Sequence, residues 1–153
     1  MPVGPFPQQR TADCPARAFE TGAGTDSVRV LLADDNPAIL RSLATFLKGS
    51  TRMHVVEMVS SGEQALERVG ALQPDLVLMD ISMPGMGGLE ATRRIKGRPG
   101  APRVVVVSFN DDPAYRAAAR TVGGDGFVSK AEINEELMPV IEDLFPAGTG
   151  DCA

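Results

Sequence analysis

Five short runs rich in apolar residues alternate with longer amphipathic stretches through the middle of the chain. Turn-forming or charged residues bound each run. Short apolar runs of this kind are typical of strands that a parallel sheet buries on both faces. We therefore predict strands over residues 28–34, 53–59, 76–80, 103–108 and 126–129.

The stretches between these strands carry helix signals. The Asn36–Pro37 dipeptide supplies a cap and a first-turn proline for the first helix. Ser61 and Gln64 have the spacing of a capping box for the second helix. The Asp112–Pro113 dipeptide predicts the start of the fourth helix. An apolar face with helical spacing follows the first cap, at Ile39, Leu40, Leu43, Phe46 and Leu47.

Pro139 conflicts with the last helical stretch. A proline inside a helix removes a hydrogen bond and costs about 3 kcal/mol. We expect either a helix that begins near Asn134, with Pro139 close to its first turn, or a kinked helix. With this last helix, the chain contains five strand–helix units. That pattern predicts an α/β fold, a (βα)5 doubly wound parallel sheet.

The pattern extends over residues 28–145, which we predict to form one domain. Residues 1–27 are rich in proline, glycine, threonine and alanine without periodicity, so we predict a disordered amino-terminal arm. Residues 146–153 are predicted to form a flexible carboxyl-terminal tail. Cys14 and Cys152 lie in these two segments, and we expect reduced thiols rather than zinc ligands or a redox pair.

The 153-residue chain has a net charge of −5. General binding to nucleic acids or anionic membranes is not expected, because both need a positive surface. No run approaches the ~18 apolar residues of a membrane span, and the amino terminus lacks the apolar stretch of a signal peptide. We therefore predict a cytoplasmic protein. His54, the single histidine, is expected at the surface of the second strand.

Polar residues of different kinds stand where the strands end. Asp34 and Asp35 close the first strand, Asp80 closes the third and Ser108 closes the fourth, and Lys130 follows the fifth. Because ligands of open parallel sheets bind beyond the carboxyl ends of the strands, these side chains should meet at one edge. Carboxylates suit Mg2+, and a carboxylate can also accept a phosphoryl group. The Lys130 ammonium and the Ser108 hydroxyl can contact the oxygens of that phosphoryl group.

Each of these residues also has a simpler interpretation. The adjacent acids can cap the first helix, Lys130 can be a solvated lysine, and Ser108 can be bonded to the backbone. Taken singly, each simpler interpretation would be favoured. Their combination at four strand ends favours a phosphoryl site in which Asp80 is the nucleophile.

The stretches LLADDNPAILR, DLVLMDISMPGMGGLEATRRIK, VVVVS and GGDGFVSK occur in this order. Together they closely resemble the receiver domain of two-component response regulators, over about residues 28–145. The resemblance implies a flavodoxin-like sheet with strand order 2-1-3-4-5. Since no second domain follows in this sequence, we expect a chemotaxis-type, stand-alone receiver.

The resemblance also implies roles for individual residues. Asp80 matches the phosphoacceptor, and Asp34 and Asp35 match the acids that bind Mg2+ together with it. The backbone carbonyl of Ser82 is expected to add a ligand. Lys130 matches the lysine that contacts the phosphoryl group.

Two further positions match the switch residues of the family. Ser108 corresponds to the switch hydroxyl, and Phe127 corresponds to an aromatic position that is often tyrosine. Phe109 is bulky where many members have a small residue, which bears on how a phosphodonor reaches the site. A cis peptide often follows the family lysine, here between Lys130 and Ala131.

The implied function is a phosphorylation-activated switch that catalyses only its own phosphorylation and dephosphorylation. A histidine kinase or histidine phosphotransfer protein would supply the phosphoryl group. The face of the fourth helix, fifth strand and fifth helix would bind a downstream protein or a second copy. Direct binding to nucleic acid or membrane is not expected.

Three alternatives belong to other classes. A Mg2+-dependent phosphatase or phosphotransferase usually carries a second acid two residues after its nucleophile, where this chain has Ser82. An interaction module that works without phosphorylation would not need all five site residues. A DNA-binding regulator would need a carboxyl-terminal effector domain beyond this chain.

Overall fold

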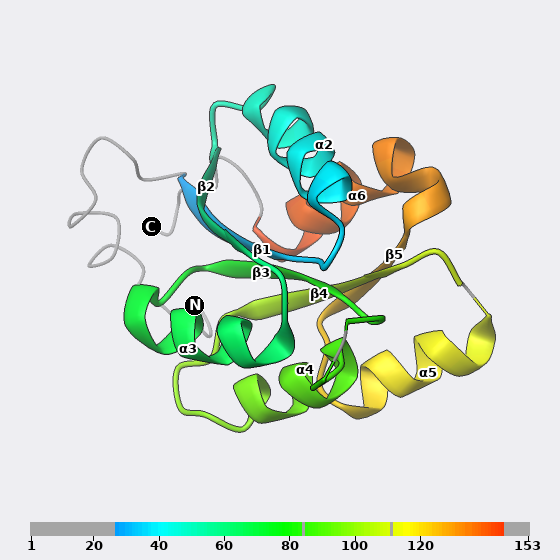
Figure 1. The fold of residues 1–153 in the computed structure, drawn as a ribbon. Coiled ribbons are helices and arrows are strands. Elements are labelled where there is room, and N and C mark those ends of the chain that lie inside the picture. Colours follow the sequence, from blue (N-terminus) through cyan, green and yellow to red (C-terminus); the bar gives the residue numbers. More distant parts are fainter. Residues whose placement is uncertain (1–26, 84, 111, 146–153) are drawn as a thin grey trace, which may run out of the picture.

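A five-stranded parallel sheet in the order β2-β1-β3-β4-β5 forms the centre of the computed structural model (Figure 1). The strand order expected from the resemblance is therefore confirmed. The structure describes residues 27–83, 85–110 and 112–145, so nearly all of the predicted arm and the whole predicted tail lie outside the described residues. The strands are β1 (Val28–Ala33), β2 (Met53–Val59), β3 (Leu76–Asp80), β4 (Arg103–Ser108) and β5 (Gly126–Ser129).

Helices cover both faces of this sheet. Figure 1 shows α2 and α6 on one face and α3, α4 and α5 on the other. Apolar side chains alternate between the two layers, so each strand is buried on both sides. The bounds are α2 (Pro37–Lys48), α3 (Gly62–Leu72), α4 (Gly88–Lys96), α5 (Pro113–Thr121), a short 3-10 helix η2 (Lys130–Glu132) and α6 (Ile133–Leu144).

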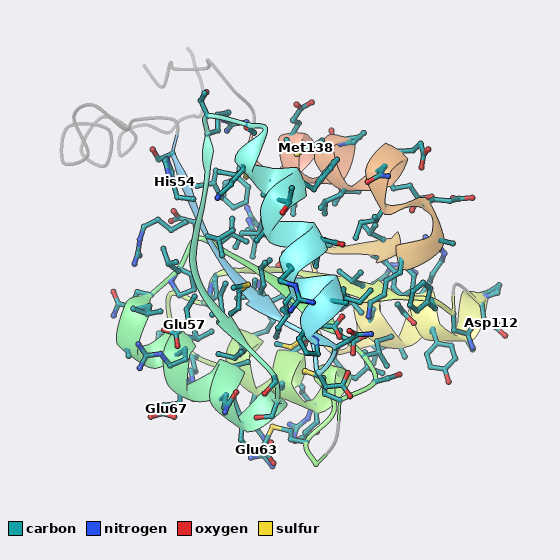
Figure 2. The ribbon with its side chains drawn as sticks, turned by 45° about the horizontal axis from the view of Figure 1, so that its top comes forward. His54, Glu57, Glu63, Glu67, Asp112 and Met138 are labelled. Atoms are coloured by element: carbon teal, nitrogen blue, oxygen red, sulfur yellow. The ribbon has the colours of Figure 1, made fainter. Side chains whose placement is uncertain are left out.

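The predicted helix starts are confirmed by their capping hydrogen bonds. The Asn36 side chain accepts from the backbone N–H of Ala38 at 2.9 Å. Ser61 Oγ accepts from the Gln64 N–H at 3.1 Å, although the Gln64 side chain accepts from Ser60 rather than Ser61. Asp112 caps α5, which it precedes directly in Figure 2.

Pro139 lies inside α6, which begins at Ile133. The start near Asn134 is therefore confirmed, but the expectation that Pro139 would sit near the first turn is wrong. Leu137 and Ile141, on either side of it, are fully buried against the sheet. Tertiary packing of this apolar face outweighs the local cost of the proline, as helix stability in proteins generally depends on such packing.

Two expectations about the surface can be compared with the described residues. His54 is exposed on β2, as predicted (Figure 2). Within the described segments, no helix combines the length and the apolar character needed to cross a bilayer.

Gly88, the first residue of α4, allows that helix to pack against the end of β3. A Cβ atom at this position would lie 1.9 Å from the backbone carbonyl oxygen of Asp80. Real atoms cannot approach so closely, so Gly88→Ala must push α4 away from β3. We expect it to lower the free energy of unfolding by about 1–3 kcal/mol, the usual cost of overpacking. Chemical denaturation measures this change.

Gly70→Ala is the matched control for this prediction. Gly70 lies inside α3, and a Cβ there would meet only the Arg98 guanidinium, at an ordinary 3.5 Å. Because alanine favours helix, the control should leave stability unchanged or raise it by up to about 1 kcal/mol. Equal stability of the two variants would contradict the close approach of α4 to Asp80.

Candidate functional site

The strand register brings the carboxyl ends of β1 and β3 level with each other. Ala33 is paired with Met79, the last pair between these neighbouring strands. Asp34 and Asp80 are the next residues of each strand, so their side chains emerge side by side. The backbone N–H of Asp34 also bonds to the carbonyl of Val59 at 3.1 Å, which anchors the end of β1 to β2.

The register of β4 and β5 completes this edge. Ser108 is paired with Ser129, and Lys130 follows at once. Asp80 is paired with Val107, so Ser108 lies one residue beyond it on β4. The structure therefore gathers the predicted strand-end residues at one edge of the sheet.

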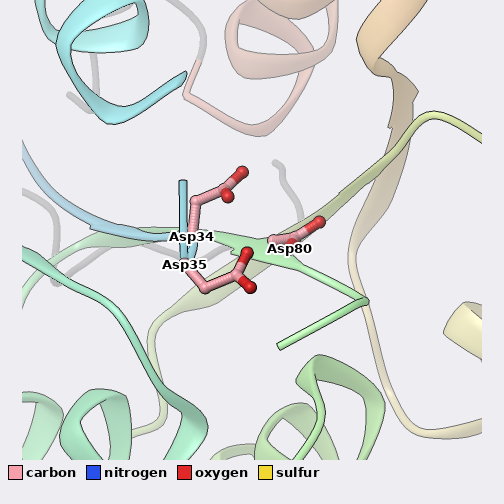
Figure 3. Close-up of side chains that lie close together, drawn as sticks. All are labelled: Asp34, Asp35 and Asp80. Carbon is pink, nitrogen blue, oxygen red and sulfur yellow. The ribbon is translucent and has the colours of Figure 1, made fainter. Parts of the chain in front are cut away.

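Asp34, Asp35 and Asp80 form a cluster of carboxylates at this edge (Figure 3). One oxygen of each lies within 4.8 Å of the others. Asp34 and Asp80 are only 2% and 4% exposed, whereas Asp35 faces solvent. Asp34 Oδ1 accepts from the Asn36 N–H at 2.9 Å, so it supports the start of α2 while its other oxygen stays in the cluster.

The Lys130 ammonium bridges the two buried carboxylates. Its Nζ lies 2.5 Å from Asp34 Oδ2 and 2.9 Å from Asp80 Oδ1, and its side chain is 7% exposed. Burial favours the neutral amine, but the hydrogen bonds to both aspartates outweigh it and raise the pKa of Lys130 above its ordinary value. Lys130 is therefore a charged group held inside the site.

The pKa of Asp80 is also raised. Burial is the main cause, and the nearby charge of Asp34 adds to it, whereas Lys130 and the backbone N–H of Ser82 act in the opposite direction. Lys130 pairs with two of the three clustered carboxylates, so the cluster has more negative than positive groups. Oxygen ligands in this number and spacing fit a hard divalent cation, which would relieve the repulsion.

The predicted switch residues lie on β4 and β5. Ser108 is buried, and its Oγ accepts from the Asn110 N–H at 3.0 Å, which leaves the hydroxyl proton available to another acceptor. Phe127 is half-buried, and the Arg116 guanidinium of α5 lies 4.7 Å from its ring centroid. For Ser82, the structure gives a backbone hydrogen bond to Asp80; its carbonyl as a ligand stays a prediction.

Some contacts in this region were not predicted from the sequence. The stacking of Arg116 on Phe127 is one, and the hydrogen bond from the Ser129 N–H to the Glu136 carboxylate, at 3.2 Å, is another. No motif signals either, because each joins two elements whose distance depends on packing. One expectation is corrected: the peptide bonds described, including the one after Lys130, are all trans, so the expected cis bond is absent there.

Comparisons with known proteins agree with this geometry. Residues 30–142 match the family model of the response regulator receiver domain. The response regulator GacA of Pseudomonas aeruginosa is 32% identical over 118 residues, which are 77% of this chain and 55% of that protein. The nitrate/nitrite response regulator NarL of Escherichia coli K12 is 32% identical over 112 residues, 73% of this chain and 52% of that protein.

A solved structure is similar as well. The signal receiver domain of the response regulator NarL from Mycobacterium tuberculosis superposes with a TM-score of 0.74 at 30% identity, covering 79% of this chain and 98% of that one. The chain spans about half the length of the curated relatives named here. The family match contains the acidic edge and all of the sheet except the first two residues of β1. The chain therefore belongs to the response regulator receiver domain family, the phosphorylation-activated switches of two-component signalling.

Proposed function

We propose that Asp80 accepts a phosphoryl group from a phosphohistidine and that this changes the partner-binding face of the domain. The observation that carries the proposal is the buried pair of Asp34 and Asp80, bridged by Lys130 and joined by the third carboxylate of Asp35. Phosphoryl transfer requires mainly positioning and neutralisation of charge. This edge has a buried carboxylate, an ammonium and a hydroxyl that can serve these ends.

Asp34, Asp35 and Asp80 would hold Mg2+, with the backbone carbonyl of Ser82 as a further ligand. The ion would supply positive charge beside the phosphoryl oxygens. A Mg2+-dependent phosphatase is less well supported, because exposed Ser82 stands where such enzymes usually place a second acid.

Protein groups would do the rest of the chemistry. A carboxylate oxygen of Asp80 attacks the phosphorus atom, and the bond from phosphorus to the histidine nitrogen breaks. Lys130 exchanges its ion pair with Asp80 for one with the new phosphoryl group. The Ser108 hydroxyl donates a hydrogen bond to a second phosphoryl oxygen, while its oxygen still accepts the hydrogen bond from the Asn110 N–H.

The partner-binding face would consist of α5, β5 and α6, which are the fourth helix, fifth strand and fifth helix of the prediction. Ser108 is on β4, which pairs with β5, and Phe127 of β5 lies beneath Arg116. Movement of Ser108 toward the phosphoryl group would therefore change the packing of this face. The donor would be a histidine kinase or histidine phosphotransfer protein. The receiver would bind a downstream protein or a second copy.

Several narrower predictions stay proposals. A chemotaxis-type, stand-alone receiver is one of them, since the chain spans about half of the GacA and NarL proteins it resembles. The absence of direct nucleic-acid binding is another, because one similar structure, 25% identical, is named a DNA-binding response regulator of the LuxR family from Staphylococcus aureus. Catalysis limited to its own phosphorylation and dephosphorylation, and a cytoplasmic location, also stay predictions.

Asp80→Asn tests the phosphoacceptor. The amide cannot form the acyl phosphate, so we expect mass spectrometry to find one added phosphoryl group on the wild type and none on the variant, after incubation with acetyl phosphate and Mg2+. Asp143→Asn, which changes an exposed acid on α6, should be labelled like the wild type. Stoichiometric labelling of Asp80→Asn would show that another residue is the nucleophile.

Lys130→Ala tests the role of the ammonium that pairs with both Asp34 and Asp80. We expect it to change the affinities for Mg2+ and for a phosphoryl mimic in opposite directions. Removing the ammonium takes away a cation that competes for Asp34 and Asp80, so Mg2+ should bind about tenfold more tightly by calorimetry. Beryllofluoride, a phosphoryl mimic, should bind more weakly because its fluorides lose a charged partner. Lys48→Ala, at an exposed position on α2, should change neither affinity. Unchanged Mg2+ binding in Lys130→Ala would contradict this role.

A further inference from the structure

The β3–α4 loop, residues 81–87, begins directly after Asp80 and carries Ser82. Its two ends are held together, because the Gly88 N–H donates to the carbonyl of Ile81 at 3.0 Å. The Ser82 N–H bonds to the Asp80 carboxylate, so this part of the loop lies against the acidic cluster. The course of the loop backbone therefore decides where the Ser82 carbonyl points.

The first turn of α3 holds the same loop at a second place. The Glu63 carboxylate accepts a hydrogen bond from the Met86 N–H at 3.2 Å, and Glu63 can be found at the start of α3 in Figure 2. Gly62 packs against the Met86 carbonyl so closely that a Cβ atom there would lie 2.5 Å from its oxygen. The helix therefore contacts both polar groups of the Met86 backbone.

The glycines beside Met86 cannot hold the loop by themselves. Gly85 has a φ of +71°, a conformation that glycine adopts without strain but does not enforce. Gly87 is the N-cap residue of α4 and makes no side-chain bond to the N–H groups of that helix. The exposed Glu63 side chain supplies its bond across 23 positions of the chain. A residue of another helix thus fixes the point where the loop is locally most permissive.

We propose that Glu63 is a positioning residue for the Mg2+ site, which holds the β3–α4 loop so that the Ser82 carbonyl faces the ion. This inference rests on the proposed function and deepens it. Glu63 is not one of the three clustered carboxylates, so it acts through Met86 and the loop backbone rather than by touching the ion. Groups that orient metal ligands from outside commonly change metal affinity when they are removed.

A role through charge alone makes a different prediction. A carboxylate in the first turn of α3 interacts favourably with the helix dipole, and negative charge near the site attracts cations. Both effects depend on the charge of Glu63 and not on its bond to Met86. Glutamine separates the two roles, because its amide oxygen can accept from the Met86 N–H but carries no charge.

The experiment compares Glu63→Ala, Glu63→Gln and Glu67→Ala with the wild type. Calorimetry measures Mg2+ binding, and NMR measures solvent exchange of the Met86 amide hydrogen without Mg2+. Glu63→Ala should bind Mg2+ about three- to tenfold more weakly and exchange this hydrogen faster, the scale of one lost hydrogen bond. Glu63→Gln should stay within about twofold of the wild type, because it keeps the acceptor. Glu67→Ala removes an exposed acid one turn further along α3 and should match the wild type.

Labelling by acetyl phosphate separates positioning of the ion from the chemical step. In Glu63→Ala, the Mg2+ concentration that gives half of the maximal labelling rate should rise by the same factor as the Mg2+ dissociation constant. The maximal rate at saturating Mg2+ should stay within about twofold of the wild type, because the occupied site again holds the Ser82 carbonyl. A maximal rate that falls while Mg2+ affinity is unchanged would overturn the proposal.

The outcomes distinguish this inference from the proposed function. If the wild type is not labelled at Asp80 in the presence of Mg2+, the proposed function itself fails. If the wild type is labelled but Glu63→Ala binds Mg2+ as tightly, the positioning role is overturned while the phosphoacceptor stands. Equal losses of affinity in Glu63→Ala and Glu63→Gln would overturn it too, since charge would then be the cause. Thermal unfolding verifies that each variant is folded at the temperature of the measurements.

Discussion

The ion pairs of Lys130 with Asp34 and Asp80 are the interaction on which the rest of this edge depends. They join the ends of β1, β3 and β5, although Lys130 and Asp34 stand 96 positions apart in the chain. Burying charges is costly, and such pairs add little net stability even when their geometry is good. With three carboxylates against one ammonium, the cluster is poorly explained as a device for stability. It is better explained by the proposed function, in which these groups bind a divalent cation and a phosphoryl group.

The sheet supplies the rigidity that such a site needs. Its strands are buried on both faces, so a one-residue slip in register would move each side chain into the opposite core layer and disrupt the packing of both. The positions of Asp34, Asp80 and Ser108 therefore follow from the register rather than from loops. Gly88 adds to this by letting α4 press against the Asp80 carbonyl, which holds the end of β3 from one side.

The same edge connects to the proposed output face by direct contacts. Ser108 is paired with Ser129, and the Glu136 carboxylate of α6 holds the backbone N–H of that serine. Arg116 of α5 lies over Phe127, two residues before Ser129. A displacement at Ser108 would thus reach both helices through β5. Packed elements of this kind shift between discrete arrangements, which suits a two-state switch.

Local sequence patterns were enough to predict the elements and the kinds of groups at the strand ends. The apolar runs, the caps at Asn36, Ser61 and Asp112, and the polar residues that close the strands depend on local patterns, which a single chain displays directly. The motif order, by resemblance, also led to the correct strand order. Of the two alternatives for Pro139, the one that put it near the first turn was wrong, because burial of Leu137 and Ile141 outweighs local propensity.

Which side chains share a partner follows from the folded arrangement alone. Lys130 was predicted near the phosphoryl group, but its bridge between Asp34 and Asp80 is visible only once β5 and η2 are placed. The Phe109 ring over the same ammonium is a further case. Such contacts depend on distances of a few ångströms between residues far apart in sequence. Those distances arise from strand register and helix packing, which no local pattern encodes.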